Sequence, residues 1–96
     1  MPYYSMKEFN LEGFEKSKTK HKMYDAIIQN KKTKKNVRVP FGDKRYQNYQ
    51  DLTGLNLYPK LIHGDKERRS KYWARHKGFI KKGFYSPGYF SLHVLW

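Results

Sequence analysis

The sequence contains no cysteine, and this absence removes several kinds of site. It excludes a scaffold held by disulfides, a thiol nucleophile and a zinc site built on cysteine. Acidic residues are also few, with eight Asp and Glu against 21 Lys and Arg, and no pair of them is arranged for acid–base catalysis. A nucleophile-elbow serine and a Gly-rich phosphate loop are missing as well. The sequence therefore predicts a protein that is not an enzyme, needs no cofactor and takes no small-molecule substrate.

Long apolar runs are a further absence. No stretch approaches the ~20 apolar residues that cross a membrane. The first ten residues also lack the charged and apolar regions of a signal peptide. We therefore expect a soluble protein without a membrane span.

What the chain does contain is positive charge and aromatic rings. Aromatic residues make up 18% of its 96 residues, which separates it from disordered basic tails and fits one small domain. Residues 1–15 carry a net charge of −2, residues 16–82 carry +15, and residues 83–96 carry none. A surplus of this size repels itself, so it indicates a polyanionic or acidic partner.

The charge pattern predicts two parts, an N-terminal arm with a basic linker at residues 1–21 and a small basic domain at residues 22–96. The arm carries large rings at irregular spacing, and "SMKE" at residues 5–8 matches a helix capping box. Two interpretations remain open: the arm folds back on the domain, or it anchors on a partner protein. The candidate anchor residues, one of them at the other end of the sequence, are Tyr3, Tyr4, Phe9, Phe14 and Trp96.

A β-hairpin is the first element that we expect in the domain. "KMYDAIIQ" and "NVRVPF" have the composition of strands, and Val37, Val39 and Phe41 alternate onto one face. The lysine-rich segment between them begins with Asn30 and is typical of a turn. Pro40 cannot donate to a strand ladder, so the second strand should lie at an edge.

The following residues 42–61 predict a loop in which Leu55, Leu57 and Leu61 contact the core. Asp65 as N-cap and Gly78 just beyond the last turn then predict a helix over residues 66–77. Ser86-Pro87 predicts the start of a short final helix that places Phe90, Val94 and Leu95 on the core. The expected fold class is therefore α+β: one small domain with a β-hairpin packed on one or two short helices, an extended aromatic N-terminal arm and a C-terminal tail.

The segment "HGDKERRSKYWARHKGF" crowds together residue types that bind metals. His63 and His76 lie thirteen residues apart, however, and no HxxxH or HExxH spacing brings two imidazoles onto one helical face. We therefore expect no metal site. Helical spacing instead predicts a structural motif in which Asp65 caps the helix and pairs with an arginine. Its remaining members, His76 packed beside Tyr72 and Trp73, would form a ring-lined inner face.

Nucleic-acid binding is the main chemical function that the residues suggest. The candidate residues for nucleic acid or an acidic partner lie on the hairpin turn and on the helix: Lys31, Lys32, Lys34, Lys35, Arg68, Arg69, Lys71 and Arg75. Each could neutralise a phosphate, and Tyr72 and Trp73 could stack on bases. In the other interpretation, the rings face the core while the arginines face solvent or acidic protein loops. Composition leaves these two interpretations open.

A resemblance to a known family adds a biological setting. The runs "FGD-RY-NY", "HGDKERRSKYWARHKGF" and "GFYSPGYFSLHVLW" resemble small, basic, largely uncharacterised proteins of large nucleocytoplasmic DNA viruses, of the phycodnavirus and mimivirus groups. The family pattern His-x-Asp-x-x-Arg-x-x-Tyr-x-x-Arg-His corresponds here to His63, Asp65, Arg68, Tyr72 and the pair at residues 75–76. The resemblance covers roughly residues 22–96 and implies a viral setting rather than a mechanism.

Together, the composition and the resemblance lead to two expected functions. The first is a non-enzymatic structural protein of a large DNA virus particle, a minor capsid or cementing component that binds neighbouring virion proteins or packaged DNA. It would be located in the virion, and in the host cytoplasm or virus factory during assembly. The alternative is a sequence-independent nucleic-acid-binding protein for DNA or RNA, either packaged in the virion or similar to ribosomal proteins.

Overall fold

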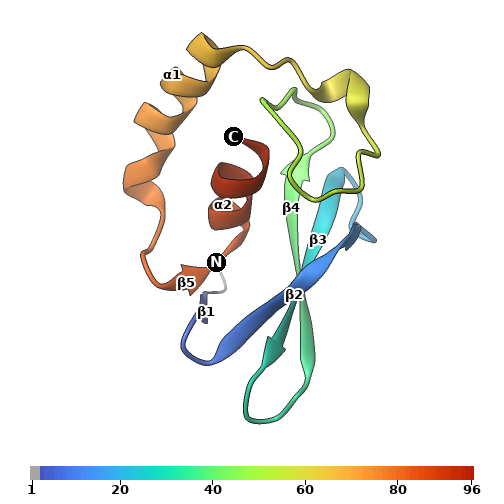
Figure 1. Ribbon diagram of the computed structural model, residues 1–96, viewed down its shortest axis with the longest axis vertical. Coiled ribbons are helices and arrows are strands. Elements are labelled where there is room, and N and C mark those ends of the chain that lie inside the picture. Colours follow the sequence, from blue (N-terminus) through green and yellow to red (C-terminus); the bar gives the residue numbers. More distant parts are fainter. Residues whose placement is uncertain (1–2) are drawn as a thin grey trace.

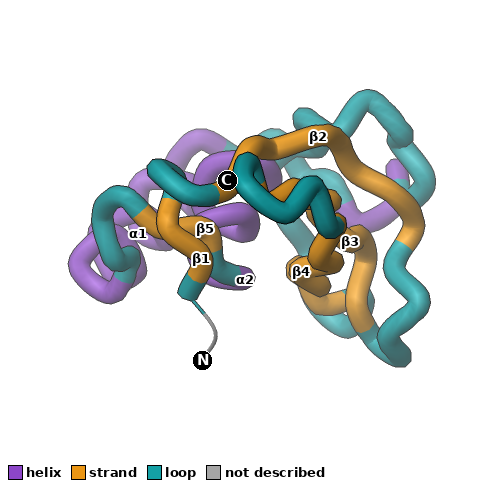
Figure 2. Tube along the Cα trace, turned by 90° about the horizontal axis from the view of Figure 1, so that it is seen from below, coloured by secondary structure: helices purple, strands orange, loops and turns teal. Residues whose placement is uncertain are grey.

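The computed structural model describes residues 3–96 and has the predicted α+β architecture (Figure 1). Its elements in chain order are β1 (Tyr4–Ser5), β2 (Phe9–Lys16), β3 (Lys22–Asn30), β4 (Asn36–Asp43), the short helix η1 (Pro59–Leu61), α1 (Lys66–His76), η2 (Lys77–Phe79), β5 (Phe84–Tyr85), α2 (Pro87–Phe90) and η3 (Ser91–Leu95). Strands β2, β3 and β4 form an antiparallel sheet in that order, and β1 pairs with β5 in a separate small sheet. Helix α2 and its continuation η3 lie between α1 and the larger sheet, so these three elements gather on one side of it, whereas η1 lies apart from them (Figures 1 and 2).

The predicted hairpin is confirmed as β3 and β4. Asn30 closes its turn, because the side-chain oxygen of Asn30 accepts hydrogen bonds from the backbone N–H groups of Lys32 and Thr33. Val39 and Phe41 are buried on the predicted face, and Pro40 lies on the edge strand as expected. Central strand β3 is covered on both sides and forms the middle of the core.

The N-terminal segment folds back on the domain, which is one of the two interpretations that the sequence left open, and it does so as a strand of the sheet rather than as a separate arm. Residues 9–16 form β2, which pairs along its length with β3, and residue 21 lies in the turn between these two strands. The register shifts between Leu11 and Gly13, and this bulge breaks the period-two pattern that would have marked a strand in the sequence. There is accordingly no domain boundary at residue 21. The predicted helical turn at residues 5–8 is instead a tight turn, in which the Ser5 carbonyl oxygen accepts from the Glu8 N–H.

Several of the candidate anchor residues therefore pack within the chain. Phe14 contacts Phe41 and Phe90 edge to face, with ring centroids 5.8 and 6.1 Å apart. Tyr4 and Phe9 also pack against the core. Tyr3 is the most exposed of the described anchor candidates in the N-terminal segment, at 44%, and its ring also contacts Phe84 edge to face at 6.3 Å.

The end of the chain closes the core, as the sequence predicts. The Ser86 hydroxyl caps α2 by accepting from the Tyr89 N–H, and Phe90, Val94 and Leu95 are buried. The loop before α1 differs from expectation. Leu55 and Leu57 are 39% and 46% exposed, so the predicted core contacts of these two residues are wrong.

Helix α1 begins where the sequence predicts. The Asp65 carboxylate accepts hydrogen bonds from the N–H groups of Glu67 and Arg68, as an N-cap should. The α-helix ends at His76, one residue before the predicted end, but the predicted cap at Gly78 is wrong, because the chain continues into η2 and Gly78 does not adopt a left-handed conformation. No residue of α1 is fully buried, so the helix lies on the surface and is held by a few side chains.

We predict that Gly42→Ala destabilises the fold more than Gly64→Ala does. Both glycines have a positive φ, of 74° and 65°, so either change introduces backbone strain of about 1 kcal/mol. At Gly42 a Cβ would also lie 2.8 Å from Leu95 Cδ1, whereas nothing lies within 4 Å at Gly64. Urea unfolding should give an additional loss of roughly 1–3 kcal/mol for Gly42→Ala. Equal losses for the two variants would contradict this packing argument.

Candidate functional site

Trp96 joins the helical side of the molecule to the loop that precedes α1. Its ring is 7% exposed, stacks on Tyr72 with centroids 4.1 Å apart, and donates from Nε1 to Asn48 Oδ1 at 3.1 Å. Its backbone oxygen accepts from Arg69 Nε at 2.6 Å. The prediction that Trp96 anchors a partner is therefore wrong, because its side chain is enclosed by this chain.

Helix α1 presents two faces with different roles. Arg69 lies over the rings of Tyr49 and Trp73, with its guanidinium carbon 5.1 and 5.8 Å from the two centroids. Together with the bond to Trp96, these contacts make Arg69 an attachment point of the helix rather than a free binding residue, which corrects the sequence prediction for it. Three other basic side chains of the helix, Arg68, Lys71 and Arg75, recur every three to four residues and share a different face.

That second face lines a groove of about 620 Å³ between α1 and the base of the β3–β4 hairpin. The groove is lined by Lys22, Gly42, Asp43, Tyr46, Gln47, Asn48, Arg68, Lys71, Tyr72, Arg75, His76, Ser91 and Trp96. Lys22 begins β3 and Asp43 ends β4, and the antiparallel register pairs these two residues at the groove end of the hairpin. Residues from four separate parts of the chain thus meet at one concave surface.

The charge balance of the groove is strongly positive. Lys22, Arg68, Lys71 and Arg75 face a single carboxylate, that of Asp43. Hydrogen bonds from Arg45 hold the pKa of Asp43 well below its usual range, and the closest N–O distance between the two side chains is 2.7 Å. The negative charge of Asp43 is consequently paired mainly with Arg45, outside the set of four cations, and Lys22 adds a smaller attraction.

Few interactions restrain the cations of the helix. Arg68 donates from Nη1 to Gln47 Oε1 at 3.0 Å, and Lys71 pairs with the exposed Glu67 at 3.3 Å. An exposed pair of this kind contributes little, so a ligand can displace it readily. Within residues 3–96, Arg75 has no hydrogen bond or ion pair through its side chain.

The aromatic residues of α1 pack inward rather than toward a ligand. Tyr72 has Trp96 and His76 at centroid distances of 4.1 Å each, and two rings at that distance must occupy opposite faces of it. Trp73 is partly buried and contacts His93 edge to face at 5.5 Å. The alternative in which the rings face the interior and the cations face outward is thus the arrangement found. Tyr46, with 66% exposure, is the groove ring open to solvent.

His63 and Asp65 are structural residues that shape the entry to α1. His63 Nδ1 accepts a hydrogen bond from the backbone N–H of Asp65 at 2.9 Å, and its ring lies 5.1 Å from that of Trp96. Burial, followed by the nearby Arg68 charge, lowers the pKa of His63. The predicted ion pair of Asp65 with an arginine does not form among residues 3–96, where the Asp65 carboxylate accepts only backbone N–H groups.

The remaining predicted basic residues lie at the far end of the same hairpin. We call residues 31–35 the lysine tip; it carries Lys31, Lys32, Lys34 and Lys35, all exposed. The basic residues that the sequence singled out therefore divide into two separated surfaces. Sequence reasoning missed Lys22 and Tyr46, because only the strand register and the path of the loop bring them to the groove.

No group of three or more His, Asp or Glu side chains in residues 3–96 is arranged to hold a metal ion. No helix of that region is both long and apolar enough to span a bilayer.

The sequence matches no protein-family model, and comparisons with curated proteins and with solved structures also find no match. The resemblance to viral proteins consequently stays a prediction from the sequence motif.

We predict that the protein loses stability as the pH falls below about 6.5 and that His63→Asn reduces this loss. The folded state lowers the pKa of His63, so acidification protonates this residue in the unfolded chain first and favours unfolding. Asparagine can still accept the Asp65 N–H bond but does not titrate. Urea unfolding at pH 7.5 and pH 5 should show a smaller difference for the variant. Identical differences for the variant and the natural protein would exclude His63 as a cause.

Proposed function

We propose that this protein binds nucleic acid without sequence preference through the groove between α1 and the hairpin base. The observation that carries the proposal is the convergence of Lys22, Arg68, Lys71 and Arg75 on one concave surface whose carboxylate is already paired. Cations gathered in this way repel each other, and a polyanion placed among them relieves the repulsion.

The chemistry of the groove favours backbone phosphates as the bound groups. Arginine and lysine bind phosphate oxygens and release condensed counterions when they do so. The groove offers little on which a base could stack, because both faces of Tyr72 are covered and Tyr46 is the groove ring that is open. Contacts made mainly to phosphates position a nucleic acid without selecting its sequence.

We predict that replacing Arg68, Lys71 and Arg75 by glutamine weakens binding to unrelated DNA oligonucleotides by a similar factor for each. Three lost phosphate contacts should lower the slope of log affinity against log salt by about 2 to 3. Fluorescence anisotropy of labelled DNA between low and moderate salt measures both quantities.

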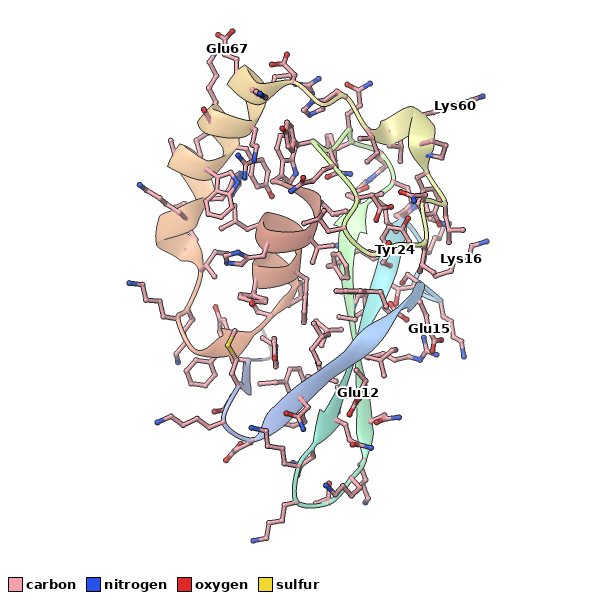
Figure 3. The ribbon with its side chains drawn as sticks, in the orientation of Figure 1. Glu12, Glu15, Lys16, Tyr24, Lys60 and Glu67 are labelled. Atoms are coloured by element: carbon pink, nitrogen blue, oxygen red, sulfur yellow. The ribbon has the colours of Figure 1, made fainter. Side chains whose placement is uncertain are left out.

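A charge-matched control is available on another part of the surface. Lys16, Lys18 and Lys60 are exposed and do not line the groove, and Figure 3 labels two of them on the side of the molecule away from α1. Changing these three to glutamine should leave the salt slope close to that of the natural protein. Binding that is absent, independent of salt, or reduced equally by both sets of changes would contradict the proposal.

A structural role in a large DNA virus particle is the second candidate function. It is supported by the sequence motif and by Leu52, Leu55 and Leu57, which expose 59%, 39% and 46% of their surface in one loop and could contact neighbouring proteins. If the role is correct, mass spectrometry of purified particles should find the protein in repeated copies. Particles that lack it would rule the role out.

A further inference from the structure

We infer that the lysine tip is a second nucleic-acid contact and that one chain therefore links two nucleic-acid segments. This inference rests on the proposed binding at the groove and extends it to a bridging activity. Three observations carry it: the distance between the two basic surfaces, the charges that lie between them, and the exposure of the lysines on an ordered turn.

The two surfaces lie at opposite ends of one hairpin. Strand β3 begins at Lys22 in the groove and ends at Asn30, the residue directly before the lysine tip. At ~3.3 Å per residue these nine residues separate the two surfaces by about 26 Å. This separation is more than twice the screening length of about 10 Å at 0.1 M salt, so each surface attracts phosphates independently. Figure 1 shows the turn between β3 and β4 projecting away from the helices.

Negative charge lies along β2, between the two surfaces. The register places Phe9 beside Asn30 at the tip end and Lys16 beside Tyr24 at the groove end. Glu12 and Glu15 lie on the strand between these points, as Figure 3 shows, and Glu15 pairs with Arg38 of β4 at 2.5 Å. Arg38 is shared with Asp25, so the three carboxylates of Glu12, Glu15 and Asp25 exceed this one arginine. A polyanion laid along this side of the sheet would pass a net negative charge. The arrangement therefore favours two separate segments, one at each end, over a single segment that covers both.

The tip presents its lysines on a fixed frame. Asn30 caps the turn, and the Asn30 N–H donates to the Lys35 carbonyl oxygen at 2.9 Å. Lys34 has a φ of 63°, a left-handed conformation that glycine or asparagine adopts more easily. Within residues 3–96, the side chains of Lys32, Lys34 and Lys35 make no hydrogen bond or ion pair. The turn therefore keeps a lysine at a strained backbone position and leaves three ammonium groups without a partner in the described residues. Such groups are suited to contact phosphates.

The test is a capture experiment with two unrelated DNA duplexes. One duplex is tethered to beads, and a second, fluorescent duplex is added together with the protein. The natural protein should carry the second duplex onto the beads. The tip variant Lys32→Gln, Lys34→Gly and Lys35→Gln should still bind the tethered duplex, while its capture of the second falls by about tenfold or more. In this variant glycine replaces the lysine that has a left-handed backbone conformation, which lowers the strain at residue 34. The changes remove no side-chain hydrogen bond or ion pair, so the variant should fold.

The outcomes separate the inference from the proposed function. Capture by the tip variant equal to that of the natural protein, or no capture by the natural protein, would overturn bridging while groove binding stands. Loss of binding to the tethered duplex by both the tip and the groove variants would indicate one continuous footprint and also overturn it. Absence of any binding by the natural protein would overturn the proposed function itself.

The Lys16, Lys18 and Lys60 variant is the control and should keep both activities. Sedimentation of the free protein should show a monomer, since a dimer could bridge two duplexes through its two grooves.

Discussion

The stack of Trp96 on Tyr72 is the interaction on which the rest of the surface depends. Helix α1 has no fully buried residue, so its position relies on this stack, on the bond from Arg69 to the Trp96 backbone oxygen, and on the partly buried Trp73. The same indole donates to Asn48, which lies in the loop between β4 and α1. One ring thus fixes both the helix and the loop that faces it. Truncating a buried ring of this size costs about 3–5 kcal/mol, a large fraction of the stability of a small domain.

This dependence has an electrostatic consequence. The cations on the groove face of α1 repel each other and repel Lys22 across the groove, and burial of their helix does little to compensate. The inward contacts of Tyr72, Trp73 and Arg69 offset that repulsion. The helical period separates these two roles. Residues that attach α1 to the rest of the protein lie on one face, and residues that carry free charge lie on another. A basic groove can therefore persist in the unbound protein, ready for a polyanion.

The sequence predicted those parts of the fold that have local signals. The β3–β4 hairpin has alternating apolar residues and an Asn30 turn, and both helix starts have side-chain caps at Asp65 and Ser86. Strand β2 was missed because the bulge near Gly13 breaks its alternation. The groove could be predicted only in part. Periodicity places Arg68, Lys71 and Arg75 on one helical face, but the opposite wall depends on long-range register, and no local pattern connects Lys22 or Tyr46 to the helix.

The packing of Tyr72 also limits what the groove can recognise. An aromatic ring that stacks on bases needs one open face, and Tyr72 gives one face to Trp96 and the other to His76. Its phenol is buried enough to raise its pKa, so the side chain serves the interior. The charged groups that remain toward the groove are mainly ammonium and guanidinium groups, which bind phosphate whatever base it carries. The contact that holds α1 in place is thus also the reason that the proposed binding would depend on phosphates rather than on bases stacked against Tyr72.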